Sequence, residues 1–366
     1  MRRLILLVLC LMLTPVLSAA SISDYWSHPE YYQTHQEQLP WLRELAGAVR
    51  SEPVPFDGEQ ERPVRIGLVY PSMQSSSYWA DNEHAFIARL NQLGIHYELQ
   101  ARYTEPSTQL GEQVEQIREL LEWKPDFLIY TLDSVQQKMI IERLMLSSNT
   151  KLILQNITTP LKAWGERQPF LYAGFDHAEG ALRLADYFSR HFPGGARYAV
   201  LFRNRGVVSQ MRGSGFIQAV DRSHELSASY YTDSSREGGR DATLRLLAGQ
   251  PELDYIYACS TDVALGAIDA LQETGRNDVL VNGWGGGAEE LEQLRLKKLN
   301  VVLMRMNDDS AIAMAEAIKR DLAGRPVPLI YSGTFVVLDE DMPASQVRRY
   351  ERLSRRASLG TGESGQ

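Results

Sequence analysis

The most informative part of the chain reads VRIGLVYPSMQSSSYWADNEHAFIARLNQL and occupies residues 64–93. Its first seven residues, Val64 to Tyr70, form an apolar run before Pro71, which is typical of a buried strand. From Trp79 to Leu93 apolar residues recur at helical spacing, and Gly94 then ends the pattern. The stretch therefore predicts a strand followed by a helix, which is the repeating unit of a parallel α/β sheet.

The same alternation continues along the chain. A strand over residues 126–132 precedes a helix over 135–146, and a second series begins near Asp176 with a helix over 177–191. Consecutive apolar residues in the later runs suit parallel strands that are covered on both faces. These runs lie at residues 151–157, 198–203, 254–259, 279–283 and 301–306. We predict an α/β protein with two open, doubly wound parallel-sheet lobes.

The two ends of the chain differ from its middle. Residues 1–20 combine Arg2 and Arg3 with an apolar run and a small-residue end, which predicts a cleaved signal peptide and export to the periplasm. Residues 21–62 are aromatic and polar, and we expect an N-terminal extension with one helix near residues 36–50. At the other end we expect a final strand over 331–338 and a polar tail over 351–366.

Composition excludes several classes of protein. The 366 residues include 38 Lys and Arg against 46 Asp and Glu, for a net charge of −8, and 44% are hydrophobic, which is ordinary for a globular chain. The acidic balance argues against nucleic-acid binding. Cys10 lies in the predicted signal peptide, so Cys259 remains alone and is expected to be a buried thiol without a disulfide. No Cys and His spacing indicates a metal site.

Polar and aromatic residues follow the ends of the predicted strands. In open parallel sheets, ligands bind beyond the carboxyl ends of the strands, so these residues are the candidate site. The candidates are Gln74 to Trp79, Asn156, Ser209 to Arg212, Ser260 to Asp262, Trp284 and Arg305. The set contains no obvious nucleophile and base, so we expect a binding protein and not an enzyme.

The candidates also have ordinary structural interpretations. Trp79 fits the core side of a helix, and Arg212 fits a solvated helix charge. Asp262 is expected only to cap a helix that begins at Val263. The run from Gly283 to Ala288 satisfies the dinucleotide pattern G-x-G-x-x-A, which leaves a dinucleotide-dependent enzyme as a remote alternative. That pattern normally opens the first βαβ unit, however, and here it comes near the end of a lobe.

Several longer runs carry a family resemblance. They are Val69-Tyr70-Pro71 with Tyr78-Trp79, LILQNITTP at 152–160, QPFLY at 168–172, GFDHAEG at 174–180, residues 255–267, NGWGGG at 282–287 and MRMNDD at 304–309. From about residue 24 to 350, the chain resembles the autoinducer-2 receptors among the type I, ribose-binding-like periplasmic binding proteins. The resemblance implies two lobes joined by three crossovers. The implied division is residues 63–175 with about 308–332 for the first lobe, and 176–307 with about 333–350 for the second.

The resemblance also implies a site and a ligand. The implied ligand-binding residues are Gln74, Ser76, Trp79, Asn156, Arg212, Thr261, Trp284 and Arg305. The implied ligand is autoinducer-2 as a furanosyl borate diester, with boron as part of the ligand and no separate cofactor. The implied partner is the periplasmic domain of a LuxQ-like sensor histidine kinase, without nucleic acid or membrane insertion. The alternative is a pentose- or furanose-binding protein of an ABC transporter, but two arginines favour an anionic ligand over a neutral sugar.

Overall fold

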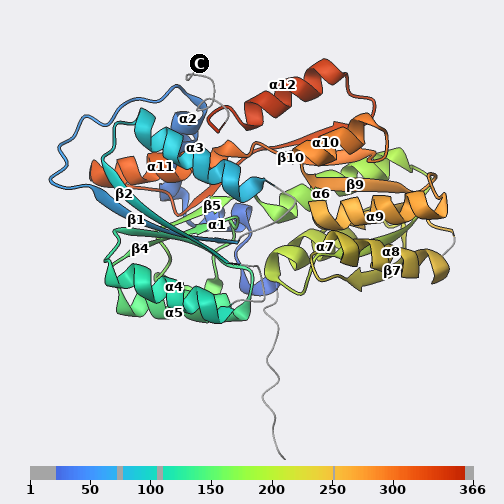
Figure 1. Ribbon diagram of the computed structural model, residues 1–366, viewed down its shortest axis with the longest axis horizontal. Helices are drawn as coiled ribbons and strands as arrows, with labels where there is room; N and C mark the ends of the chain where they lie inside the picture. The colour runs from blue at the N-terminus through green and yellow to red at the C-terminus, as the bar shows by residue number, and fades with distance from the viewer. Residues whose placement is uncertain (1–21, 72–76, 105–109, 250–251, 359–366) are drawn as a thin grey trace, which may run out of the picture.

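The computed structural model describes residues 22–71, 77–104, 110–249 and 252–358 (Figure 1). Within these residues the strands form two six-stranded sheets, and each sheet builds one lobe. The predicted signal peptide lies outside the described residues. No helix in the described part of the chain is both long and apolar enough to cross a membrane.

Lobe 1 is built on a parallel sheet with the strand order β11-β5-β4-β3-β1-β2. Its central strands are buried, whereas the edge strand β2 is only partly buried, which is the pattern of a sheet covered on both faces. The strands are β1 (Val64–Pro71), β2 (Tyr97–Thr104), β3 (Phe127–Thr131), β4 (Lys151–Gln155), β5 (Leu171–Gly174) and β11 (Ile330–Ser332).

Helices cover both faces of this sheet (Figure 1). One face packs against α2 (Leu39–Arg50), α3 (Tyr78–Gln92) and α11 (Asp308–Leu322), and the other against α4 (Leu110–Glu122) and α5 (Val135–Ser147). Ser134 caps α5 by accepting a hydrogen bond from the Gln137 N–H.

Lobe 2 has the strand order β12-β10-β9-β8-β6-β7, and its strands are parallel except for β12, which runs antiparallel to β10. Its strands are β6 (Arg197–Phe202), β7 (Glu225–Tyr231), β8 (Tyr255–Ala258), β9 (Leu280–Gly285), β10 (Val301–Arg305) and β12 (Phe335–Asp339). One face packs against α6 and α7, and the other against α8, α9, α10 and α12. These helices are α6 (His177–His191), α7 (Val207–Ala219), α8 (Arg236–Gly249), α9 (Thr261–Thr274), α10 (Ala288–Arg295) and α12 (Ala344–Ser354). Two doubly wound α/β lobes were predicted, and the prediction is confirmed.

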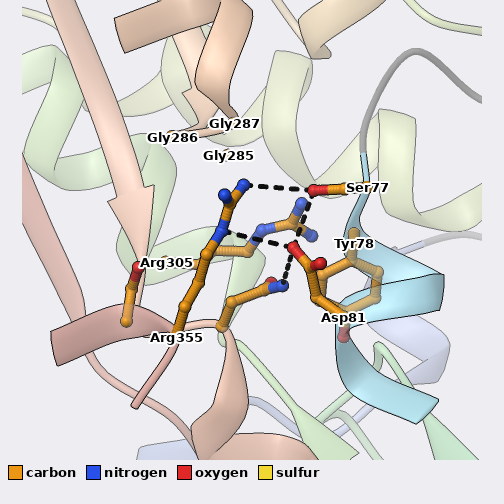
Figure 2. Close-up of a pocket in the computed structure, with 10 residues that line it drawn as sticks. Ser77, Tyr78, Asp81, Gly285, Gly286, Gly287, Arg305 and Arg355 are labelled. Carbon is orange, nitrogen blue, oxygen red and sulfur yellow. Dashed lines mark hydrogen bonds and ion pairs between the residues drawn. The ribbon is translucent and has the colours of Figure 1, made fainter. Parts of the chain in front are cut away.

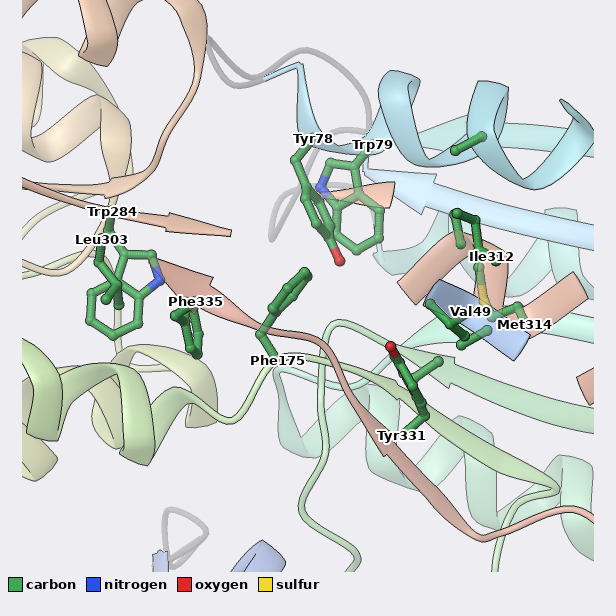
Figure 3. Packing of buried hydrophobic residues seen from close by; sticks show 14 of the residues in the cluster. Val49, Tyr78, Trp79, Phe175, Trp284, Leu303, Ile312, Met314, Tyr331 and Phe335 are labelled. Carbon is green, nitrogen blue, oxygen red and sulfur yellow. The ribbon is translucent and has the colours of Figure 1, made fainter. Parts of the chain in front are cut away.

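The chain passes from one sheet to the other between β5 and α6, between β10 and α11, and between β11 and β12. Glycines allow the chain to pass close to its neighbours at two of these crossovers. A Cβ on Gly174 would lie 2.7 Å from the Ile157 nitrogen, and one on Gly333 would lie 2.6 Å from the Phe175 ring. Aromatic residues also run from one lobe to the other, in the order Trp284, Phe335, Phe175, Tyr78 and Trp79 (Figure 3).

The ends of the described chain differ from the sequence-based expectations. The N-terminal extension contains more than one helix, because α1 (His28–Thr34) and two short 3-10 helices, Ile22–Asp24 and Gln36–Gln38, accompany α2. The single strand expected over 331–338 is divided into β11 and β12, which belong to different sheets. Helix α12 runs across residue 351, where we expected a polar tail to begin.

Candidate ligand-binding site

A pocket lies between the two lobes, beside the β10–α11 crossover (Figure 2). Lobe 1 contributes the start of α3, and lobe 2 contributes the glycine turn after β9 and the end of β10. The lining residues are Ser77, Tyr78, Asp81, Gly285, Gly286, Gly287, Arg305, Asn307, Ser354 and Arg355. The pocket is therefore polar, and parts of the chain from both lobes enclose it.

Of the described residues that were predicted as ligand-binding residues, Arg305 alone lines this pocket. The predicted residues that the structure describes lie at strand ends and in helices. They are Trp79 in the first turn of α3, Asn156 directly after β4, Arg212 in α7, Thr261 at the start of α9, Trp284 in β9 and Arg305 at the end of β10. Trp79, Arg212, Thr261, Trp284 and Arg305 are buried, and Asn156 is partly buried. Gln74 and Ser76 lie outside the described residues.

Arg212 is held in the interior of lobe 2, with 5% of its surface exposed. Its Nη1 donates to the Cys259 carbonyl oxygen at 2.9 Å, and its guanidinium lies 4.5 Å from the centre of the Trp284 ring. Burial, together with the positive charges of Arg305 and Arg203, lowers the pKa of Arg212 to about 9. Arg212 therefore remains a cation at neutral pH. Cys259 itself is a buried thiol, as predicted.

His177 connects Arg212 to lobe 1. Its Nδ1 lies 3.3 Å from Arg212 Nε, and its Nε2 lies 2.9 Å from the Asn156 carbonyl oxygen. Because a guanidinium can only donate, Nδ1 must accept and Nε2 must carry the proton. Burial, with Arg212 next, lowers the pKa of His177 well below its usual value, so the ring is neutral.

Arg305 has few partners for a buried cation, with 6% of its surface exposed. Its guanidinium carbon lies 4.0 Å from the centre of the Tyr78 ring, which gives a cation–π contact across the cleft. Burial lowers the pKa of Arg305, an effect that Tyr78 and Glu290 oppose. Neither Arg305 nor Arg212 forms an ion pair with a carboxylate among the described residues.

Three predicted site residues carry buried polar atoms that have no hydrogen-bond partner in the described structure. These atoms are Asn156 Oδ1, Trp284 Nε1 and Arg305 Nε. Buried polar atoms of this kind are rare in folded proteins, because each loses its bonds to water without replacement. Asn156 also has a positive φ of 64°, a conformation that asparagine tolerates better than most residues. The predicted site residues therefore carry two unused donors, Trp284 Nε1 and Arg305 Nε, and one unused acceptor, Asn156 Oδ1.

Glu290 organises the glycine turn after β9. Its carboxylate accepts hydrogen bonds from the Trp284 N–H at 2.7 Å and the Gly286 N–H at 2.6 Å, and burial raises its pKa. Gly286 has a φ of 79°, and a Cβ there would lie 2.5 Å from Met304. In a dinucleotide site the amides of such a turn bind phosphate, but here a buried side-chain carboxylate already uses two of them. This turn does not fit a dinucleotide.

The lobes also contact each other at the start of α7. Gly206 provides no side-chain cap for this helix, and lobe 1 supplies one through Asp133. Asp133 Oδ1 accepts from the Val208 N–H at 3.0 Å, and Oδ2 pairs with Arg203. A carboxylate is favoured at a helix N-terminus, so this contact stabilises the closed arrangement of the lobes.

Sequence reasoning missed several residues of this region. Nothing in the chain order indicated that Glu290 serves the glycine turn, that Asp133 caps α7, or that His177 orients Arg212, because each acts through tertiary contacts. The capping role expected of Asp262 is wrong: α9 begins at Thr261 after Ser260, and no side chain caps it. Thr261 Oγ1 donates to the Trp284 carbonyl oxygen at 2.9 Å, which joins two predicted site residues.

Two α/β lobes that enclose a polar cleft define a protein that binds a small ligand between its lobes. A family model described as "Periplasmic binding protein domain" matches residues 66–326, and the chain belongs to this family. The ribose import binding protein RbsB of Salmonella typhimurium is 29% identical over 159 residues, which cover 43% of this chain and 53% of that protein. The chain thus spans about half the length of the curated relatives it matches.

Solved structures share the fold. A periplasmic solute-binding protein of an ABC transporter from Actinobacillus succinogenes, with bound D-allose, has a TM-score of 0.67 and 20% identity over 78% of this chain and 100% of that chain. The fructose-binding periplasmic domain of a hybrid two-component system has a TM-score of 0.69 and 17% identity, over 82% of this chain and 99% of that chain. The matched proteins are binding proteins, and this chain is not an enzyme.

Proposed function

We propose that this protein is a receptor of the LuxP type, which is exported to the periplasm and binds autoinducer-2 as a furanosyl borate diester. The ligand closes the two lobes, and the closed form is read by the periplasmic domain of a LuxQ-like sensor kinase. Boron belongs to the ligand in this proposal, and no separate cofactor is needed. Gln74 and Ser76, which precede α3 in the sequence, complete the proposed site.

The observation that carries the proposal is the pair of buried arginines without a carboxylate partner among the described residues. Burying two cations in one region is costly unless an anion compensates them. A borate diester has a fixed negative charge, and guanidinium groups bind oxyanions with directed hydrogen bonds. The unused donors Trp284 Nε1 and Arg305 Nε can bind the same oxygens, while Asn156 Oδ1 can accept from a ring hydroxyl.

A second candidate function is supported by the relatives. RbsB is a ribose import binding protein, and the allose-bound structure is a component of an ABC transporter. A carrier of a neutral pentose or furanose for such a transporter would use the same cleft, with the arginines donating to hydroxyl groups. This candidate does not explain why the site places two cations together.

Calorimetry with the chain lacking residues 1–20 separates the two candidates. The receptor proposal predicts that the furanone precursor of autoinducer-2 binds tightly only when borate is present, and that ribose binds weakly or not at all. Arg212→Met and Arg305→Met should each weaken binding at least roughly 30-fold, because losing one partner of a buried charged pair costs about 2–5 kcal/mol. The exposed Arg190→Met, which loses only a surface pair with Asp186, should bind normally.

Borate-independent binding of ribose, unaffected by either arginine variant, would contradict the receptor proposal and support the carrier. The native ligand gives an independent test. The purified protein is denatured, and the released molecule is examined by mass spectrometry and boron-11 NMR. Co-purification with the periplasmic domain of the sensor kinase tests the partner, and a lack of association with and without ligand would contradict it.

A further inference from the structure

The C-terminal part of the described chain connects the two lobes once more after the three crossovers. We define residues 344–358 as the C-terminal strap, which comprises α12 and the four residues after it (Figure 1). The helix is attached to lobe 2, whereas residues 355–358 contact lobe 1. The strap thus has one attachment to each lobe, and Arg355 lies beside the pocket.

The lobe 2 attachment is apolar. Val347 is 5% exposed and belongs to the hydrophobic cluster that includes Leu338 in β12 and Val302 in β10. Met342 and Tyr350 pack against the same cluster. Because apolar burial holds α12 on the sheet, this end of the strap should move with lobe 2.

The lobe 1 attachment is polar and lies at the start of α11. The Asp308 carboxylate accepts hydrogen bonds from the Ala357 N–H at 2.6 Å, the Ser358 N–H at 2.9 Å and the Ser358 hydroxyl at 3.0 Å. Arg356 Nη2 donates to Asp309 at 2.9 Å and to the Val49 carbonyl oxygen at 3.0 Å. These bonds fix the tip of the strap to the lobe opposite α12.

Arg355 lies between these attachments and forms part of the pocket wall (Figure 2). Its Nη2 donates to Ser77 Oγ at 3.1 Å, and its Nε lies 3.3 Å from Asp81 Oδ2. Its side chain is 16% exposed, so the pair with Asp81 is better shielded from water than a surface ion pair. Ser77 and Asp81 belong to the start of α3 in lobe 1.

We propose that residues 355–358 are a latch that holds the lobes in the closed arrangement, and that Arg355 closes one edge of the ligand pocket. If the lobes separate, the tip must leave Asp308, Asp309 and Asp81, or α12 must leave lobe 2. The latch therefore raises the closed population before any ligand binds. A ligand that binds the closed form then needs less free energy to close the lobes. Its apparent affinity rises by the factor by which the latch raises the closed population.

Distances between the lobes test the latch without any ligand. Spin labels are attached at Met139→Cys in α5 and Ala248→Cys in α8, which are exposed positions on different lobes. Cys259 should not react with the label, because it is buried and burial raises its pKa to about 12. The distance distribution is measured by pulsed electron paramagnetic resonance for the unmodified C-terminus, for Arg355→Ala/Arg356→Ala, and for a chain that ends at Ser354.

The latch predicts a broader distribution for both modified chains, with a second population at a different distance. Arg349→Ala, an exposed charge change on α12, should leave the distribution unchanged. The variant Asp81→Arg/Arg355→Asp exchanges the two charges of this ion pair. Its distance distribution should lie closer to that of the unmodified chain than the distributions of the other two modified chains do. Identical distributions in all chains would overturn the latch. Arg355→Ala/Arg356→Ala answers the question even if the shortened chain does not fold.

A second readout is the affinity for the ligand, and this readout alone rests on the proposed function. Loss of the latch should weaken binding about fivefold to tenfold, since a few shielded polar contacts bias closure by factors of this size. Weaker binding without a change in the distances would also overturn the latch and leave Arg355 as a ligand contact. If no ligand of the proposed class binds, the distance measurement still decides whether the latch exists.

Discussion

His177 shows how one buried side chain can set the chemistry of the site. It donates to the Asn156 carbonyl oxygen with Nε2 and accepts from Arg212 with Nδ1. Because burial and the charge of Arg212 lower the pKa of His177, its ring stays neutral. Its Nδ1 can therefore accept a hydrogen bond from the Arg212 guanidinium. His177 is therefore a positioning residue that joins the lobe 1 end of the cleft to the lobe 2 arginine.

Two substitutions separate its two bonds. His177→Asn places an amide oxygen near the position of Nδ1 and can still accept from Arg212, whereas His177→Gln keeps a donor near the position of Nε2. We expect the Gln variant to bind the ligand about tenfold more weakly than the Asn variant, because a lost bond to a charged group costs roughly 1.5–3 kcal/mol. Calorimetry measures the difference. The opposite order of affinities would show that the bond to the Asn156 carbonyl oxygen matters more for ligand binding than the bond to Arg212.

Helix α7 shows the same dependence on distant contacts at the level of an element. It carries Arg212, but the carboxylate that caps its N-terminus belongs to Asp133 in the other lobe. Helix α5 begins at Val135, and its cap is Ser134, the residue next to Asp133 and in the same lobe as α5. Two neighbouring residues thus cap two helices, and only one of these caps requires the lobes to be closed.

We therefore expect different effects from Asp133→Ala and Ser134→Ala. The first should weaken ligand binding about 5-fold to 30-fold through loss of the cap and of the Arg203 pair, which stabilise the closed form. The second should lower the free energy of unfolding by about 1 kcal/mol and leave affinity unchanged. Calorimetric binding and urea unfolding of both variants give the comparison, and equal affinities would show that the Asp133 contact does not favour closure.

At the scale of the whole molecule, buried acids lie close to the crossovers. Burial raises the pKa values of Asp176, Asp308 and Asp309, and that of Asp308 rises from 3.8 to about 6. Because the folded pKa is the higher one, protonated Asp308 favours the fold. Its stabilising contribution is complete below about pH 4 and is lost as the pH rises through about 6.

Asp308→Asn keeps an acceptor oxygen for the strap amides but cannot ionise. Relative to the parent protein, this variant should gain up to about 3 kcal/mol of unfolding free energy between pH 4 and pH 7, since one pKa unit corresponds to about 1.36 kcal/mol. Asp278→Asn is the control, because hydrogen bonds from Arg276 lower the pKa of the exposed Asp278, so its change has the opposite sign. Urea unfolding at a series of pH values measures both, and a parallel pH dependence of the parent and Asp308→Asn would contradict the assignment.

The local order of the chain was predictable because it depends on residues near one another in sequence. The apolar run 64–70 became β1, and the helical spacing after Trp79 became α3. The rule that ligands bind at strand ends selected Asn156, Trp284 and Arg305, which carry unused polar atoms in the structure. Cys259 was predicted as buried from its apolar neighbours alone.

Contacts between distant parts of the chain could not be read from the sequence. The antiparallel β12, the Asp133 cap, the His177 bonds and the strap on Asp308 each join residues tens of positions apart. Periodicity reports which face of an element is apolar, and residue type reports what a side chain can bind. Which partner each polar group finds depends on how two lobes pack around shared crossovers, and that arrangement exists only once the chain has folded.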